Sequence, residues 1–280
     1  MKVTILKPNG YCSGVSRAIK IALEARKENL DKEVYVLGML VHNHHVSNLL
    51  ESHNIQLVKF MDEIKENQVI VFNADGHTDE QYQIALKKNL IIYDAICPKV
   101  EQNLIKIQKE ISSGHQVIYI GQALHQETQI AISLSSDIVL YDDKAGIDWS
   151  RVKDDSPFVL NQTTLNSVEI VNLYDDIKNH LPNARISNEI CPTTRIRQEA
   201  VRFVKDVDAI IVVGDQMSSN SKRLFEIAKA FHPDTYVIMI SDVNELPIDE
   251  LKNKNHIAIS SGASTPSDVI DEIYNKLISL

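Results

Sequence analysis

Apolar residues along this chain gather in short runs of four to six, separated by polar and turn-forming residues. Many runs are rich in valine and isoleucine, as at 209–213, which is typical of strands buried on both faces. The pattern predicts strands at 3–6, 34–37, 69–72, 90–93, 117–120, 138–141, 158–160, 209–213, 236–240 and 257–260.

Between these runs the apolar period changes to that of a helix. Val15, Ile19, Ala22 and Leu23 recur at the spacing of one helical face. The same spacing predicts a short helix soon after residue 43 and longer ones at 80–88, 100–111, 167–180, 197–205, 224–231 and 267–278. Strands that alternate with helices predict the α/β class, with parallel sheets covered on both faces.

Three cysteines divide the chain into near-equal thirds. Cys12, Cys97 and Cys191 are separated by 85 and 94 residues, and 89 residues follow the last of them. Each third repeats the alternation of strands and helices, so we predict three similar α/β domains at 1–96, 97–190 and 191–280.

The composition is that of an ordinary globular protein, with 44% hydrophobic and 24% charged residues among 280. Its 29 basic and 38 acidic side chains give a net charge of −9, which argues against nucleic-acid binding. No apolar run approaches the ~18 residues of a membrane span, and Lys7 and Pro8 interrupt the N-terminal run too early for a signal peptide. We therefore expect a cytoplasmic protein that binds neither nucleic acid nor membrane.

Polar motifs follow the predicted strands. They lie at 10–12, 42–43, 74–77, 97–98, 121–127, 162–164, 191–192, 218–220 and 262–264. Because ligands bind at the carboxyl ends of strands in open α/β sheets, we expect these segments to form binding sites. If the three sheets turn these ends inward, all nine motifs converge on one pocket.

The cysteines are compatible with more than one role. A free cysteine is most often a small buried apolar residue. However, Cys12, Cys97 and Cys191 all lie at strand-to-helix junctions beside glycine or proline, where a thiolate can face a crevice. Their odd number argues against a disulfide framework, and the paired spacings typical of zinc sites are absent. A four-iron cluster on three thiolates would leave one iron open to substrate.

Two serine-rich segments could bind an anion. The runs 218–221 and 264–266 open predicted helices after strands, and helix N-termini bind phosphate. The alternative is plain N-capping, which is common. His42 and His125, which also follow strands and can donate to phosphate oxygens, favour the binding site. Glu127 in the same segment as His125 is a candidate proton donor, or else an exposed loop glutamate.

Taken in order, these motifs resemble those of the LytB family, the 4-hydroxy-3-methylbut-2-enyl diphosphate reductases. The resemblance extends from Cys12 to Ser264, and the ordered set is far more specific than any single motif. The matching segments are Gly10-Tyr11-Cys12-Ser13-Gly14-Val15-Ser16-Arg17-Ala18, Val41-His42-Asn43, Asp94-Ala95-Ile96-Cys97-Pro98, Gln162-Thr163-Thr164-Leu165, Ile190-Cys191, Arg197-Gln198-Glu199-Ala200, Ser218-Ser219-Asn220-Ser221 and Gly262-Ala263-Ser264.

The resemblance implies a trefoil of three α/β domains around a [4Fe–4S] cluster held by Cys12, Cys97 and Cys191, with one iron not bound by cysteine. It implies reductive dehydroxylation of the substrate to isopentenyl and dimethylallyl diphosphate, the last step of the non-mevalonate isoprenoid pathway, with electrons from ferredoxin or flavodoxin. Glu127 would supply protons with Thr163 in the hydrogen-bond relay. The residues that would hold the diphosphate are His42, His125, Thr163, Ser218, Ser219, Asn220 and Ser264.

The chain departs from the family pattern at three places. Asp75 stands where the family has a diphosphate-binding histidine, and a carboxylate there repels two phosphates unless it is protonated or turned away. His77, two residues further on, is the candidate to take over that role. Gln126 replaces the usual proline, and Ser16 the usual acidic residue.

Three hypotheses follow from these observations. The first is the reductase, and the second is a paralogue that uses the same cluster on another substrate, motivated by Asp75. The third is a redox-sensing or electron-transfer protein. Glu127, Thr163 and the serine-rich segment at 218–220 argue against the third, because an electron carrier does not need a diphosphate site.

Overall fold

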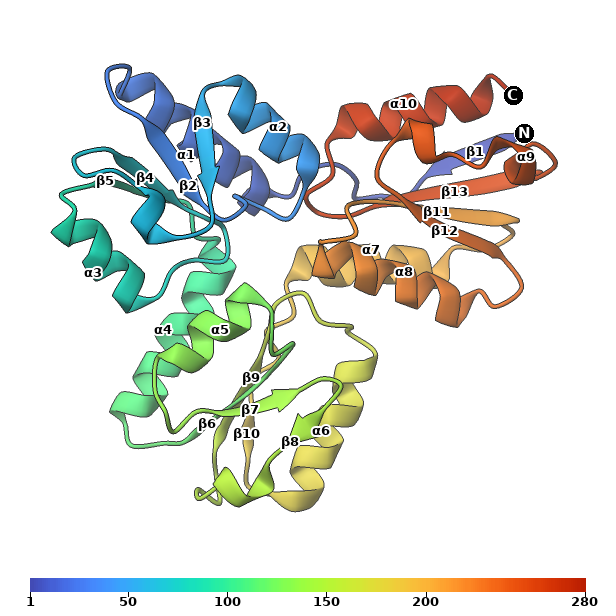
Figure 1. The fold of residues 1–280 in the computed structure, drawn as a ribbon. Coiled ribbons are helices and arrows are strands. Elements are labelled where there is room, and N and C mark those ends of the chain that lie inside the picture. The colour runs from blue at the N-terminus through green and yellow to red at the C-terminus, as the bar shows by residue number, and fades with distance from the viewer. The chain divides into compact units, whose positions relative to one another are not determined.

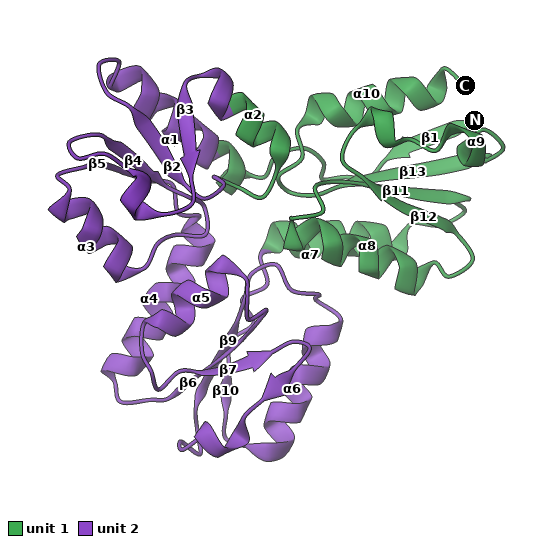
Figure 2. Ribbon diagram, in the orientation of Figure 1, with its two compact units in different colours: residues 1–16, 41–49, 192–280 green, residues 17–40, 50–191 purple.

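The computed structural model describes residues 1–280, which divide into two compact units (Figure 2). Unit 1 comprises Met1–Ser16, Val41–Leu49 and Pro192–Leu280, and unit 2 comprises Arg17–Leu40 and Leu50–Cys191. Unit 1 contains one β-sheet and unit 2 contains two.

The sheet of unit 1 joins the first strand of the chain to the last. Its order is β1-β13-β11-β12, and all neighbouring strands are parallel. The strands are β1 (Lys2–Ile5), β11 (Ala209–Val213), β12 (Tyr236–Ile240) and β13 (His256–Ser261). The helices are α7 (Pro192–Phe203), α8 (Ser219–Phe231), α9 (Ile248–Leu251) and α10 (Ser267–Ile278) (Figure 1).

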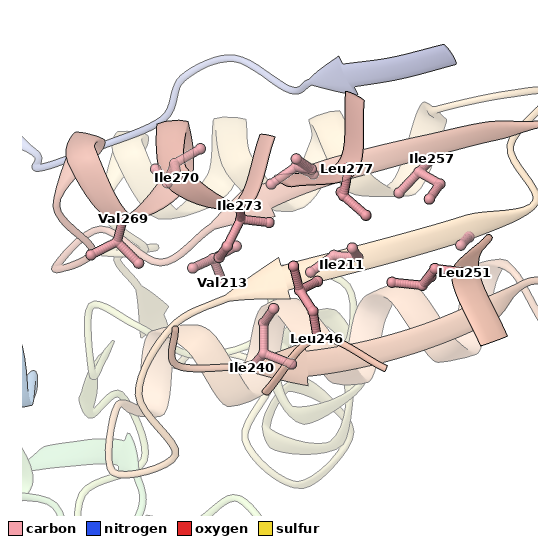
Figure 3. Close-up of a cluster of buried hydrophobic side chains, with 12 residues drawn as sticks. Ile211, Val213, Ile240, Leu246, Leu251, Ile257, Val269, Ile270, Ile273 and Leu277 are labelled. Atoms are coloured by element: carbon pink, nitrogen blue, oxygen red, sulfur yellow. The ribbon is translucent and has the colours of Figure 1, made fainter. Parts of the chain in front are cut away.

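Successive residues of β11 are buried against opposite layers of helices. Ile211 and Val213 pack in one cluster with Ile270 and Ile273 of α10 (Figure 3). Ile210 belongs to a second cluster with residues of α7 and α8. Because both faces of the strand are covered, its sequence shows no alternation of apolar and polar residues.

Unit 2 contains two sheets, with strand orders β3-β2-β4-β5 and β10-β9-β6-β7-β8. All pairs are parallel except β7 with β8. The strands are β2 (Val34–Leu37), β3 (Ile55–Val58), β4 (Val69–Phe72), β5 (Ile91–Asp94), β6 (Val117–Gly121), β7 (Val139–Asp142), β8 (Gly146–Ile147), β9 (Phe158–Asn161) and β10 (Arg185–Ile186).

Four helices lie wholly within unit 2, and two others have residues in both units. The four are α3 (Asp79–Lys87), α4 (Pro98–Ser112), α5 (Gln126–Ser133) and α6 (Glu169–His180). The other two are α1 (Ser13–Glu28) and α2 (His44–Ser52). In the second sheet, Ile118 of β6 packs in a cluster with residues of α6, whereas Tyr119 packs with residues of α4 and α5.

The predicted α/β class with parallel sheets is confirmed, and every expected strand and helix is present within a few residues. The sequence missed β3, β8, β10, α5 and α9, because short edge strands, a four-residue helix and a helix with few apolar residues leave little periodicity. The division at 1–96, 97–190 and 191–280 stays a prediction; the strand pairing places β1 with the third segment. None of the helices is both long and apolar enough to cross a membrane.

Candidate functional site

Each cysteine lies directly before the first turn of a helix. Cys12 precedes α1, Cys97 is the N-cap residue of α4, and Cys191 precedes α7. None of the three forms a disulfide, and all are half-buried. The three thiols therefore share the same position relative to a helix, and a thiolate is the form of cysteine that binds metals.

In unit 2, Glu127 lies in the first turn of α5 and is only 1% exposed. The amide of Thr163 donates a hydrogen bond to its Oε1 at 2.9 Å, and the hydroxyl of Tyr119 donates to the same oxygen at 3.1 Å. The hydroxyl of Thr163 donates to Oε2 at 2.8 Å. The interpretation of Glu127 as an exposed loop residue is therefore wrong, since its carboxyl group is buried and held in one orientation.

The surroundings of Glu127 raise its pKa to about 7. Burial is the main cause; the hydrogen bond from the Thr163 amide opposes it, and the negative charge of Asp75 raises the pKa further. A carboxyl group with this pKa carries a proton in about half of the molecules at neutral pH. Glu127 can therefore act as a general acid.

Two backbone hydrogen bonds connect cysteines to this part of unit 2. The amide of Cys191 donates to the carbonyl of Thr163 at 2.9 Å, so Cys191, Thr163 and Glu127 form one chain of contacts. The amide of Cys97 donates to the carbonyl of Ala74, also at 2.9 Å. The positions of both cysteines are thus fixed relative to the loops that follow β4 and β9.

The loop after β4 carries Asp75. Its backbone amide donates to Oδ1 of Asn73 at 3.0 Å, and Nδ2 of Asn73 donates to Oε1 of Gln126 at 3.0 Å. A carboxylate oxygen of Asp75 lies within 4.8 Å of a ring nitrogen of His125. His125 caps α5 by accepting a hydrogen bond at Nδ1 from the Glu127 amide, at 3.2 Å. The negative charge of Asp75 is therefore next to a predicted diphosphate-binding residue.

His77 is held within unit 2 by contacts of its own. Its Nδ1 lies 3.1 Å from the carbonyl oxygen of Thr78, and its Nε2 lies 3.6 Å from the carboxylate of Asp94. The ring stacks on Tyr82 and contacts Phe72. Burial acts to lower the pKa of His77, but the interactions with Asp94 outweigh it and the pKa is raised. These contacts hold the ring in place, so we predict that His77 stabilises the fold and does not bind the diphosphate.

In unit 1, the guanidinium group of Arg197 connects three separate segments. From α7, its Nη1 donates to the carbonyl and hydroxyl oxygens of Ser261 at 2.7 and 2.9 Å and to the carbonyl of Gly262 at 3.2 Å. Its Nη2 donates to the carbonyl of Gly10 at 2.6 Å. Gly10 has a φ of 71°, and a Cβ there would overlap the hydroxyl of Ser267, so the turn requires glycine.

Cys12 belongs to the same network, because its amide donates to the carbonyl of Ala263 at 3.0 Å. Arg197 is 2% exposed, none of its hydrogen bonds goes to a carboxylate, and its Nε has no partner. Burial lowers the pKa of Arg197, and the charge of Cys12 acts in the opposite direction. Because arginine stays charged when buried, this cation fits a metal centre carried on a Cys12 thiolate.

The first turn of α8 is also polar and buried. Ser218 is the N-cap residue, and its hydroxyl accepts a hydrogen bond from the Ser221 amide at 3.3 Å. Asn220 is 8% exposed, and its Nδ2 has no partner. The hydroxyl of Ser264 lies 3.4 Å from the carbonyl oxygen of His42 and donates to it. Unit 1 therefore presents amide and hydroxyl donors suited to an anion.

The structure brings the predicted residues together in two groups, one in each unit. Unit 1 holds Cys12, His42, Ser218, Ser219, Asn220 and Ser264. Unit 2 holds Cys97, His125, Glu127, Thr163 and Cys191.

Two residues of these networks were not assigned a site role from the sequence. Tyr119 was placed only in a strand, although a phenol hydroxyl within a fully buried strand needs a polar partner. Arg197 was noted only as part of a motif. Its signal is that it shares the buried face of α7 with Thr194, Gln198 and Val201.

Comparisons with known proteins identify the family of this chain. The sequence model of the LytB protein family matches residues 3–278. A 4-hydroxy-3-methylbut-2-enyl diphosphate reductase of Macrococcus caseolyticus is 36% identical over 98% of this chain and 88% of its own length. The enzyme of the same name from Lysinibacillus sphaericus is also 36% identical, over 99% of this chain and 88% of its own.

Solved structures of such reductases have the same fold. The E-1-hydroxy-2-methyl-but-2-enyl-4-diphosphate reductase from Plasmodium falciparum has a TM-score of 0.90 at 26% identity, covering 98% of this chain and 87% of that one. A structure described as (E)-4-hydroxy-3-methyl-but-2-enyl diphosphate reductase, the terminal enzyme of the non-mevalonate pathway, has a TM-score of 0.71 at 26% identity and covers both chains fully. From the ordered motifs, the buried site residues and these full-length matches, we conclude that the chain belongs to the LytB family.

Proposed function

We propose that this chain reduces (E)-4-hydroxy-3-methylbut-2-enyl diphosphate to isopentenyl and dimethylallyl diphosphate, the last step of the non-mevalonate pathway. The substrate takes up two electrons and two protons and loses its hydroxyl group as water. Membership of the LytB family supports this reaction. The observation that carries it is the buried Glu127, which Thr163 and Tyr119 hold with a pKa of about 7.

LytB proteins are iron–sulfur enzymes. For this chain we infer a [4Fe–4S] cluster held by Cys12, Cys97 and Cys191, with one iron not bound by cysteine. The half-buried thiols before three helices and the buried charge of Arg197 support that assignment. When bound, such a cluster supplies electrons and a Lewis-acidic iron for the substrate hydroxyl. Reduced ferredoxin or flavodoxin is the proposed electron donor.

The two oxygens of Glu127 have different roles in the proposed proton transfer. Oε1 faces the amide of Thr163, which can only donate, so this oxygen stays an acceptor. Oε2 faces the hydroxyl of Thr163, which can donate or accept. The acidic proton of Glu127 is therefore placed on Oε2. From there it passes to Oγ1 of Thr163 as the threonine hydroxyl gives its own proton to the substrate.

The diphosphate is assigned to seven residues that offer hydrogen-bond donors. They are His42, His125, Thr163, Ser218, Ser219, Asn220 and Ser264. Asp75 opposes this binding, since two unit charges ~4 Å apart repel by roughly 4 kcal/mol at an effective dielectric constant of ~20. The position of Asp75 thus favours a second candidate function, in which the chain is a paralogue that acts on another substrate with the same cluster. The proposed cytoplasmic location stays a prediction.

Anaerobic turnover tests the proposal. The protein, purified without oxygen and supplied with a reduced donor, should convert the hydroxylated diphosphate to both products. Conversion of a related allylic alcohol, but not of this diphosphate, would favour the paralogue. If the cluster is reduced and reoxidised but no organic substrate is consumed, the result would favour the third hypothesis, a redox-sensing or electron-transfer protein.

A further inference from the structure

Arg197 takes no part in the proton transfer or the diphosphate contacts proposed above, yet it is among the largest fully buried side chains of the molecule. Its hydrogen bonds reach from α7 to Gly10, which is 187 residues away in sequence, and to Ser261 and Gly262 at the end of β13. The amide of Gly10 donates to the hydroxyl of Ser261 at 3.3 Å, which closes this set of contacts.

The contacts of Arg197 determine where Cys12 lies. Cys12 follows Gly10 by two residues, and its amide donates to the carbonyl of Ala263, next to Gly262. Both ends of this hydrogen bond thus belong to segments that Arg197 holds. Without the guanidinium group, the hydrogen bonds of the Gly10 amide to the Ser261 hydroxyl and of the Cys12 amide to the Ala263 carbonyl would remain between these segments.

The charge of Arg197 points to an anion at the same place. All of its acceptors are neutral, namely three carbonyl groups and one hydroxyl group. A buried cation without a counter-ion is strongly unfavourable. As a metal-bound thiolate, Cys12 would supply the opposite charge, and its interaction with Arg197 acts to raise the pKa of the guanidinium group.

We infer that Arg197 is a positioning residue for the iron–sulfur centre, which fixes the Cys12 loop and supplies the positive charge that balances the thiolate-bound cluster. This role rests on the proposed function, because it takes Cys12 as an iron ligand. A nearby positive charge favours the more negative, reduced form of a cluster, so Arg197 raises the reduction potential.

Two substitutions separate the charge from the hydrogen bonds. Arg197→Lys keeps the charge but cannot reach all four acceptors, whereas Arg197→Gln removes the charge. Arg202→Gln is the matched control, because Arg202 lies on the same helix and contacts the rings of Phe203 and Phe231. The measurements are iron and sulfide content and the reduction potential from an anaerobic titration followed by electron paramagnetic resonance.

We expect a lower reduction potential in Arg197→Gln than in the wild type, with Arg197→Lys and Arg202→Gln close to the wild type. An Arg197→Gln protein that loads a full cluster at the wild-type potential would overturn the inference. So would an Arg197→Lys protein with a potential as low as that of Arg197→Gln.

If neither Arg197 variant loads a cluster, the reduction potential cannot be compared. The positioning role is then tested by amide hydrogen exchange of the metal-free proteins. The amides of Gly10 and Cys12 should exchange faster in both variants, while the amides of β11 stay protected. Unchanged exchange at Gly10 and Cys12, or loss of protection throughout unit 1, would reject a local positioning role. Cys12→Ser tests the underlying assignment separately: if it keeps a full cluster, the proposed ligand set fails, whatever Arg197 does.

Discussion

Glu127 in unit 2 and Arg197 in unit 1 are both almost completely buried, but only Glu127 loses its charge near neutral pH as a result. Glu127 accepts hydrogen bonds from Thr163 and Tyr119, and its pKa rises to about 7, so it loses its charge in part of the population. Arg197 donates to four oxygen atoms and has no carboxylate partner.

The difference follows from the chemistry of the two groups. A carboxylate can relieve the cost of burial by binding a proton near neutral pH. A guanidinium group cannot relieve it by releasing one, because its pKa lies far above that range. The buried carboxyl group is therefore suited to moving protons, and the buried guanidinium group is suited to holding an anion in place.

Removal of a cysteine should have the largest effect. Cys12→Ser removes the thiol whose charge, once ionised, acts on Arg197, and Cys191→Ser removes the thiol of the residue whose amide donates to Thr163. Both should abolish stable cluster loading, as should Cys97→Ser, because each removes one of the three thiolates proposed to hold the cluster. Iron and sulfide analysis after anaerobic reconstitution measures the loss. A variant with full iron content would remove that cysteine from the ligand set.

Glu127→Gln should lower turnover by ~10²–10⁴, the usual contribution of general acid catalysis, while the cluster and diphosphate binding remain. Stopped-time assays with a reduced donor give the rate, and anaerobic calorimetry gives the affinity. Glu80→Gln, in the exposed first turn of α3, is the matched control and should turn over normally. Normal turnover in Glu127→Gln would place the proton donor elsewhere.

The same variant tests the effect of the raised pKa on stability. The pKa of Glu127 rises from an ordinary value of 4.5 to about 7 in the folded protein. Protonation of Glu127 therefore contributes to the free energy of unfolding, and this contribution is fully present below pH 4.5. This contribution is lost as the pH rises through 7, where the buried carboxyl group would have to ionise. Thermal unfolding of Glu127→Gln should therefore depend less on pH between these limits than unfolding of the wild type.

Asp75→Asn should move the pH profile of kcat/KM. Activity that needs protonated Glu127 falls as the pH rises through about 7. Loss of the Asp75 charge lowers the pKa of Glu127, so this fall should begin at lower pH. Diphosphate binding should tighten at the same time, by tenfold for each ~1.4 kcal/mol of repulsion removed.

Tyr119→Phe gives a control of opposite sign for that profile. The hydroxyl of Tyr119 lowers the pKa of Glu127, so its removal should move the fall in activity to higher pH. Shifts of both variants in the same direction would show that neither acts through Glu127. Weaker diphosphate binding in Asp75→Asn would instead indicate that Asp75 contacts this protein's own substrate, and would favour the paralogue.

His77→Ala should have the smallest effect on function. His77 and Asp94 differ from both Glu127 and Arg197, because each stabilises the charged form of the other. The pKa of His77 is raised and that of Asp94 is lowered. Loss of the ring contacts with Tyr82 and Phe72 should cost about 1 kcal/mol of unfolding free energy, measured by urea denaturation. Diphosphate affinity should not change; a clear loss would restore His77 as a substitute for the histidine missing at position 75.

Local sequence determined the secondary structure and the chemistry available to this protein. The run Ala209–Val213 forms a strand at its predicted bounds, because five consecutive apolar and mostly β-branched residues suit a strand covered on both faces. The order of the cysteine, histidine and serine motifs likewise identified the family, since that order depends on the chain alone.

Tertiary structure decided which groups meet, and therefore which of them are chemically active. The partners of Glu127 lie 8 and 36 residues away in sequence, and Gly10 lies 187 residues from Arg197. A sequence motif does not report burial or the distance to another charge, so the raised pKa of Glu127 and the contacts of Arg197 could not be inferred from it. Both effects arise because the fold removes a charged group from water and then determines which donors, acceptors and charges surround it.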